Sequence, residues 1–106
     1  MTSFKRGDVV LVDLGFTAKV RPCVVVSISK ADSQRNMSVV APITKEIRGG
    51  ECEVVFPKPR WLAEPSVINL IGIVGVDNIK IGRTLGPVPA ETMHKVSEGL
   101  ARMLAI

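Results

Sequence analysis

Cysteine, histidine and aromatic residues are scarce in this chain of 106 residues, which has two cysteines, one histidine, one tryptophan and no tyrosine. A structural zinc site needs about four Cys, His or acidic ligands in a recognisable spacing, and Cys23, Cys52 and His94 do not provide one. We therefore expect neither a metal site nor another cofactor. Because cysteine is often buried, and both cysteines fall inside predicted strands, we expect two buried free thiols.

Long hydrophobic runs are also missing. The longest, residues 67–76, is interrupted by Asn69 and is too short to span a bilayer. No charged and then apolar leader opens the chain, so we expect a cytoplasmic protein with no membrane partner. Hydrophobic residues still make up 46% of the chain, with a mean hydropathy of +0.30. This content is high for a small monomer and favours a buried subunit interface, most simply that of a two-fold homodimer.

Acidic residues are outnumbered, with ten Asp and Glu against fourteen Lys and Arg, which gives a net charge of +4 and a pI near 9.4. This balance favours a polyanionic partner, although many small basic domains bind no nucleic acid. The length suits a single domain over residues 1–106.

Short β-branched runs separated by turn residues predict antiparallel strands. The predicted strands cover residues 9–14, 22–26, 37–44, 51–56 and 66–74, with a shorter one around 80–85. The first is apolar enough to be covered on both faces. Gly49 and Gly50 would supply the positive φ angles of a tight hairpin between the third and fourth strands.

A helix is predicted from about Ala90 to Leu104, where Pro89 suits the first turn and Glu91 complements the N-terminal dipole. His94 falls on the polar face, and we expect it to be a solvated surface residue rather than a catalyst. The predicted apolar stripe consists of Met93, Val96, Leu100, Met103 and Leu104. The resulting fold class is mainly β (α+β), a small antiparallel barrel with a C-terminal helix.

Arg21 and Thr44 carry the main functional indication. If the second and third strands pair antiparallel, Arg21 begins one where Thr44 ends the other, and a guanidinium and a hydroxyl then project from one rim. Such a pair can bind a phosphodiester. Two structural explanations stay open: Arg21 could pair with Asp8 or Asp13, and Thr44 could bond a turn.

Residues 57–65 contain three prolines and cannot be regular structure. Trp61 lies there after Lys58 and Arg60. It could stack an unpaired base, or it could fill the barrel or a dimer interface. The candidate RNA-binding side chains are Lys19, Lys45, Arg48, Lys58, Arg60 and Trp61.

Several stretches resemble the PemK/MazF toxin family of toxin–antitoxin systems, in the right order along nearly the whole chain. They read KRGDVVLVDL at residues 5–14, RPCVVVS at 21–27, VVAPIT at 39–44, RTL at 83–85 and VPAETM at 88–93. The resemblance implies an SH3-like barrel of about five to six strands, a homodimer and a cognate antitoxin. It also implies a metal-independent endoribonuclease acting on single-stranded RNA, with Arg21 and Thr44 at the family's catalytic Arg and Thr positions.

The chemistry suits these residue types, because RNA carries its own nucleophile in the 2′-hydroxyl. The protein mainly has to align that group and stabilise charge on the phosphate, leaving a 2′,3′-cyclic phosphate and a 5′-hydroxyl. The sequence shows no clear general base to accept the proton of the 2′-hydroxyl. Glu46 and water are candidates. In the alternative interpretation, Glu46 is simply a solvated loop residue.

The chain departs from the family pattern in three places. The loop 15–20 is short, and of residues 71–77 only Asp77 clearly matches. Ile71 and Asn69 stand where related members have acid–base groups, and no histidine lies in the first loop. The competing hypothesis is therefore a non-catalytic SH3-like binding module, either a decayed toxin that still pairs with its antitoxin or an inhibitor of a protein target, as the related gyrase-poisoning toxins are.

Overall fold

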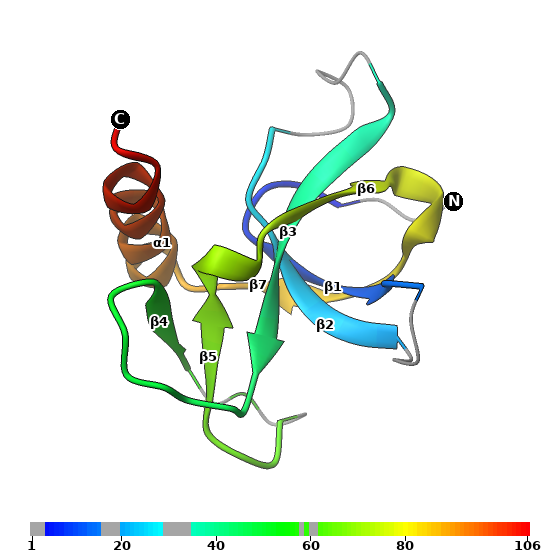
Figure 1. The fold of residues 1–106 in the computed structure, drawn as a ribbon. Coiled ribbons are helices and arrows are strands. Elements are labelled where there is room, and N and C mark those ends of the chain that lie inside the picture. Colours follow the sequence, from blue (N-terminus) through cyan, green and yellow to red (C-terminus); the bar gives the residue numbers. More distant parts are fainter. Residues whose placement is uncertain (1–3, 16–19, 29–34, 58, 60–61) are drawn as a thin grey trace.

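The computed structural model describes residues 4–15, 20–28, 35–57, 59 and 62–106. These residues form seven strands, two short 3-10 turns and one helix (Figure 1). In chain order the elements are β1 (Asp8–Asp13), β2 (Val20–Val25), β3 (Met37–Thr44), β4 (Glu53–Phe56), β5 (Ser66–Asn69), η2 (Leu70–Gly72), β6 (Val74–Asp77), η3 (Asn78–Lys80), β7 (Ile81–Pro87) and α1 (Ala90–Leu104).

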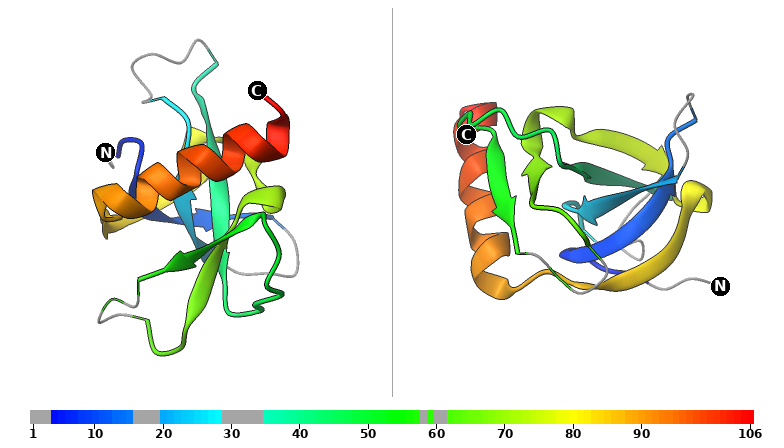
Figure 2. Two further views of the ribbon diagram at one scale, coloured as in Figure 1. Left: turned by 90° about the vertical axis from the view of Figure 1, so that its left-hand side faces the viewer. Right: turned by 90° about the horizontal axis from the view of Figure 1, so that it is seen from below.

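The strands form one antiparallel sheet in the order β4-β5-β3-β2-β1-β7, with β6 also paired to β3. The sheet bends strongly, and α1 lies at one side of it against β4 and η2 (Figure 2). This arrangement confirms the predicted fold class. Within the described chain, no pairing joins β4 to β7, so the barrel is not closed.

Side chains alternate between two apolar clusters along the central strands, as the period of a β-strand requires. On β1, Val9 joins the cluster beneath α1, whereas Val10 and Val12 join a second cluster on the other face. Their exposed fractions are 0–2%. The prediction that this strand is covered on both faces is therefore confirmed.

The single strand predicted over residues 66–74 is wrong. Both β5 and β6 run antiparallel along one edge of β3, but η2 interrupts them. Ile43 pairs with Ile68 and Val40 pairs with Val74, so three steps along β3 are matched by six along the partner. The extra residues form a bulge that places Leu70 in the core.

Leu70 anchors this bulge against α1. It is fully buried, and a Cβ added at Gly99 would lie only 2.5 Å from its Cδ1. The helix can approach η2 this closely because position 99 has no side chain. The packing fixes the position of Asn69 and Ile71, which flank Leu70 in the chain.

The tight hairpin predicted between the third and fourth strands is also wrong. Gly49 does adopt a positive φ of 77°, but β5 lies between β3 and β4 in the sheet. Residues 45–52 must therefore cross the end of β5 instead of turning back on β3. Cys52, in this crossing, is half-buried, whereas Cys23 in β2 is fully buried.

The helix matches its predicted bounds, and Val96 is fully buried in its apolar stripe. Leu104 is 51% exposed, so its place in the stripe was wrong. The side chain of His94 is 74% exposed and lies 3.5 Å from Glu98, one turn along, which confirms its surface position. Among the described residues, no helix has the length and apolar character needed to cross a membrane.

Candidate active site

Arg21 and Thr44 are brought together by the register of β2 and β3. Cys23 pairs with Pro42, and Val25 pairs with Val40. Extending this register by two residues sets Arg21 opposite Thr44, and opposite residues of an antiparallel pair share one face. Arg21 is exposed at the strand end and Thr44 is half-buried. The predicted juxtaposition at one rim of the sheet is confirmed.

A hollow of about 400 Å³ opens at this rim, and we call it the Arg21 hollow. It combines two cations and two carboxylates with an apolar wall from the strand ends. Its lining is Arg21, Pro22, Ile43, Thr44, Lys45, Glu46, Leu62, Ala63, Glu64 and Ser66.

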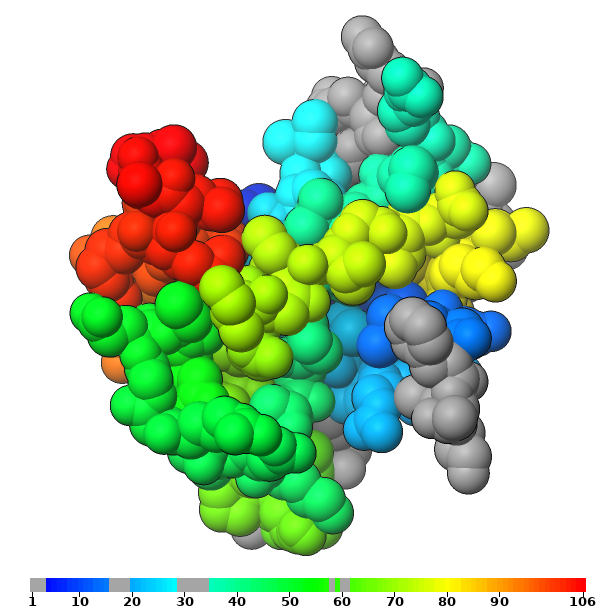
Figure 3. Space-filling view, in the orientation of Figure 1, coloured from blue at the N-terminus to red at the C-terminus, as the bar shows by residue number. Residues whose placement is uncertain are grey.

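A second hollow of about 410 Å³ shares Thr44 and Glu46 with the first, and we call it the Asn69 hollow. The remaining lining comes from the crossing loop, the start of β4, the end of β5 and η2: Arg48, Gly50, Cys52, Glu53, Asn69 and Ile71. Figure 3 shows the green segment that follows β3 beside the yellow-green segment of η2 on one face of the molecule.

The hydroxyl of Thr44 accepts a hydrogen bond from the backbone N–H of Glu46, with 3.1 Å between nitrogen and oxygen. The expectation that Thr44 bonds a turn is thus confirmed. A threonine hydroxyl has a proton to donate as well as lone pairs to accept. The bond to Glu46 therefore fixes Thr44 while leaving its O–H able to donate to a ligand.

The expected alternative for Arg21, an ion pair with Asp8 or Asp13, is wrong for the residues that the structure describes. Asp8 lies 3.6 Å from the ammonium group of Lys5, and Asp13 accepts a hydrogen bond from the backbone N–H of Gly15. Within the described ranges no carboxylate pairs with Arg21, so its guanidinium reaches the hollow without one.

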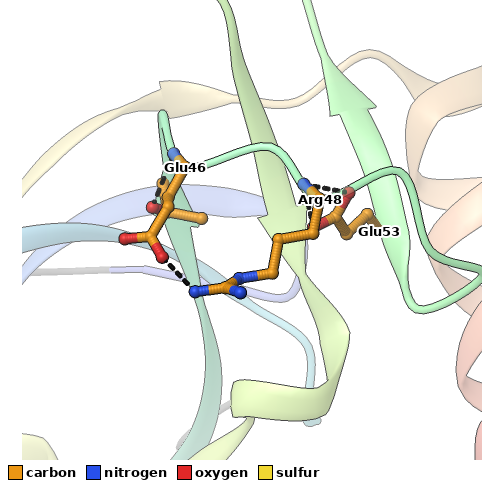
Figure 4. A network of polar contacts seen from close by, with 4 residues as sticks. Glu46, Arg48 and Glu53 are labelled. Atoms are coloured by element: carbon orange, nitrogen blue, oxygen red, sulfur yellow. Dashed lines mark hydrogen bonds and ion pairs between the residues drawn. The ribbon is translucent and has the colours of Figure 1, made fainter.

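Residues 46–53 form a polar network over the Asn69 hollow (Figure 4). The guanidinium of Arg48 pairs with the Glu46 carboxylate. The Glu53 carboxylate accepts hydrogen bonds from the backbone N–H of Arg48 at 3.0 Å and of Gly49 at 2.8 Å. Glu53, on the first residue of β4, thereby holds the crossing loop in place.

The structure places two of the six predicted RNA-binding side chains at the site. Lys45 lines the Arg21 hollow and lies 3.5 Å from Glu64, and Arg48 lines the Asn69 hollow. The other four lie outside the described residues, namely Lys19, Lys58, Arg60 and Trp61.

Three residues of the site carried no functional prediction: Glu53, Glu64 and Asn69. The alternation of residues 51–54 gives a strand with one wet face, but it cannot show that Glu53 binds the N–H groups of a loop. Glu64 lies in a proline-rich stretch, where no sequence pattern indicates a functional role. Asn69 reads as a polar interruption of an apolar run.

The two hollows together present three cations and three carboxylates beside the Thr44 hydroxyl, so they offer both phosphate-binding groups and proton acceptors. Nowhere in the described ranges do three or more His, Cys, Asp or Glu side chains gather closely enough to hold a metal ion. Burial raises the pKa of the Cys23 thiol to about 12, and Arg21 opposes this shift. A buried, protonated thiol is a poor nucleophile, so Cys23 belongs to the core and not to the chemistry.

Comparison with known proteins agrees with this geometry. Residues 5–104 match the family described as the PemK-like, MazF-like toxin of type II toxin–antitoxin systems. No curated protein sequence matches the chain significantly.

Solved structures resemble the chain over nearly its whole length. An endoribonuclease from a mycobacterial species, in complex with its cognate antitoxin, is 26% identical, with a TM-score of 0.82 over 98% of this chain and 97% of that one. Toxin MazF-mt6 of Mycobacterium tuberculosis is 22% identical, with a TM-score of 0.78 over 93% and 97%. MazF in a MazE–MazF complex of Deinococcus radiodurans is 21% identical, with a TM-score of 0.81 over 100% and 99%.

The last two likenesses concern the fold alone, whereas the family match covers the sequence itself, including Arg21 and Thr44. The chain therefore belongs to the PemK-like, MazF-like toxins of type II toxin–antitoxin systems.

Proposed function

We propose that this toxin is an endoribonuclease that cleaves single-stranded RNA in the cytoplasm without a metal ion. The observation that carries the proposal is the meeting of Arg21 and Thr44 in one hollow, with no carboxylate paired to Arg21 in the described chain. The family match and the solved endoribonuclease at 26% identity support it.

Arg21 stabilises the charge that grows on the phosphate in the transition state. Its planar guanidinium presents parallel N–H donors that match two phosphate oxygens. Because Arg21 projects from a strand, the sheet holds its backbone, and no carboxylate in the described ranges has to be displaced before its guanidinium meets a phosphate. Thr44, held by the N–H of Glu46, donates its hydroxyl proton to a neighbouring phosphate oxygen.

Glu46 accepts the proton of the attacking 2′-hydroxyl. It follows Thr44 by two residues and borders both hollows. The 2′-oxygen forms a bond to phosphorus as the bond to the 5′-oxygen breaks, and the 5′-oxygen takes a proton from water. Arg48, which pairs with Glu46 in the free protein, moves to the RNA backbone when substrate binds, because both side chains are more than 70% exposed.

A cleavage assay in EDTA tests this proposal. The purified protein should cut a long single-stranded RNA at discrete sites, leaving 5′-hydroxyl and 2′,3′-cyclic phosphate ends. An RNA with one 2′-deoxyribose at the cut site should resist cleavage there, since the nucleophile is missing. Arg21→Ala should be inactive with an unchanged circular dichroism spectrum. A folded wild-type protein that makes no cuts would contradict the proposal and favour the non-catalytic binding module.

We also propose that the toxin forms a homodimer and binds a cognate antitoxin. The relative from Deinococcus radiodurans was solved as a MazE–MazF complex, and the mycobacterial endoribonuclease was solved in complex with its cognate antitoxin. Large apolar side chains also stand at the surface, including Val55 at 76% and Ile79 at 87% exposure. Light scattering at micromolar concentration should give twice the 11.4 kDa chain mass. A monomer would contradict the dimer.

A further inference from the structure

We propose that the Asn69 hollow binds one unpaired nucleobase next to the scissile phosphate, and that the side-chain amide of Asn69 reads the edge of that base. This inference rests on the proposed nuclease function and adds a specificity-determining residue to it. Three features of the hollow carry it: its position, the state of the Asn69 amide and the surface beside that amide.

The position of the Asn69 hollow follows from its shared wall. Thr44 and Glu46 line both hollows, so a phosphate held by Arg21 and Thr44 lies at the boundary between them. A single strand that crosses this boundary must place its next nucleotide in or over the Asn69 hollow. Arg48 stands at the same hollow and can meet the backbone phosphate of that nucleotide.

The Asn69 amide is polar, half-buried and not used by the fold. Asn69 precedes η2 in the position of a cap, but its side chain makes no capping hydrogen bond. No other hydrogen bond of this amide occurs among the described residues. An amide offers a carbonyl acceptor and an NH₂ donor side by side, which is the pattern that pairs with a nucleobase edge.

The Asn69 amide packs closely against the backbone of Gly72. A Cβ at Gly72 would lie 2.8 Å from Asn69 Nδ2 and 3.1 Å from Pro42 Cγ. The amide therefore lies directly over the backbone of Gly72, in space that any other residue would fill. A polar group that is locked by packing, yet has no partner of its own in the described chain, is suited to specific recognition.

Ile71 supplies an apolar surface beside the amide. Ile71 is 68% exposed and lines the same hollow as Asn69 and the half-buried Cys52. An unpaired RNA base is normally recognised by packing on its face and hydrogen bonding on its edge. Ile71 and Asn69 provide these two functions from adjacent walls. Asparagine pairs best with adenine, whose N6 donor and N7 acceptor face it together, so we expect adenine at this position.

The first test compares the cleavage-site profiles of wild type and variants on a randomised RNA library. Asn69→Ala should reduce the preference at one nucleotide flanking the cut by at least about tenfold, while the other positions keep theirs. Asn69→Asp has the same shape but only accepts hydrogen bonds, so it should shift that position toward cytosine, whose N4 group donates. An unchanged profile in both variants would overturn the proposal.

Two further variants separate recognition from general effects. Gly72→Ala keeps the amide but displaces it, and it should reproduce the loss seen in Asn69→Ala. Lys95→Ala lowers the net charge by one, as Asn69→Asp does, but lies on an exposed face of α1 and lines neither hollow. Its profile should match that of wild type. Thermal unfolding of each variant shows which of them stay folded.

The second test does not depend on cleavage. Cys52 lines the hollow, and the other cysteine, Cys23, is fully buried, so alkylation by iodoacetamide reports on Cys52. A single-stranded RNA that carries a 2′-deoxyribose at the cut site should slow this alkylation several-fold, and less so in Asn69→Ala. Protection without any cleavage of the all-ribose RNA would overturn the nuclease proposal alone. Cleavage without protection would overturn the nucleobase subsite alone.

Discussion

Arg21 and Arg48 stand at neighbouring hollows, but the structure holds them in opposite ways. Arg21 belongs to a strand of the central sheet and has no carboxylate partner in the described chain. Arg48 belongs to a crossing loop, its guanidinium pairs with Glu46 and its backbone is held by Glu53. Arg21 is therefore ready to bind phosphate in the free protein, whereas Arg48 must first leave its partner.

The same contrast extends to the walls of the two hollows. The Arg21 hollow takes part of its lining from β2 and β3, which also build the core, so its geometry is set with the fold. The Asn69 hollow is formed mainly by the crossing loop and the bulge between β5 and β6. The phosphate-binding pair Arg21 and Thr44 thus lies on strands of the core, whereas most of the second hollow lies on segments whose residues can change with less effect on the core.

The largest effect is expected from comparing the two arginines. Arg21→Ala should lower the cleavage rate by about a thousandfold, the upper end for removal of one donor to transition-state charge, and Arg21→Lys should recover only part of it because an ammonium lacks the planar fork. Arg48→Ala should lower the rate by at most about tenfold, since its contact is to backbone phosphate. Single-turnover kinetics measure both, and equal losses would remove the distinction.

A smaller loss is expected at the proposed base. Glu46→Gln should lower the single-turnover rate about a hundredfold, because the amide cannot accept the proton. Glu64→Gln, which changes the other carboxylate of the Arg21 hollow, should change the rate only a few-fold. Were the Glu64 variant the slower of the two, the proton acceptor would be Glu64.

Substitutions of Thr44 measure how much this residue, which lines both hollows, contributes to the cleavage rate. Thr44→Val keeps the shape but loses both the donor and the acceptor for the Glu46 N–H, and it should slow cleavage by about ten- to a hundredfold and lower the free energy of unfolding by about 1 kcal/mol. Thr44→Ser keeps the hydroxyl and should stay within a few-fold of wild type. A valine variant with full activity would show that Arg21 acts alone.

The buried thiol of Cys23 makes the stability of the core depend on pH. The pKa of Cys23 rises from 9.0 to about 12 on folding, so its contribution to stability is fully present below pH 9 and is lost as pH rises toward 12. In that window the unfolded thiol ionises while the folded one stays protonated, which lowers the free energy of unfolding by about 1.4 kcal/mol per pH unit.

Urea titrations between pH 8 and 10.5, with Cys23→Ala as the reference, isolate this slope from that of other groups. The alanine variant should lose stability with pH more gradually than the wild type. Parallel slopes would mean that the Cys23 thiol ionises in the folded protein.

Much of the fold was predictable because local rules and tertiary packing agree. The third strand and the helix match their predicted bounds because β-branched runs, Pro89 and the helical apolar stripe each signal one structure. The pairing of β2 with β3 followed from the loop between them, and it made the meeting of Arg21 and Thr44 predictable.

The wrong strand and hairpin predictions lie where the structure depends on contacts between segments that are far apart in the sequence. Residues 66–74 look like one strand, but burying Leu70 against Gly99 of the helix requires a bulge. The Gly49 turn resembles a hairpin, but β5 pairs with β3 at the position that β4 would take. Neither event has a local sequence signal, because the interacting residues lie far apart along the chain.

The sequence by itself determined the family, the antiparallel sheet with its C-terminal helix, and the pair Arg21 and Thr44, because each depends on residue types close together or on one strand pairing. Only the tertiary structure decided that Thr44 and Glu46 border two hollows, that Glu53 holds the crossing loop and that the Asn69 amide lies over Gly72. These contacts join strand ends to loops, and packing of the whole chain sets their positions.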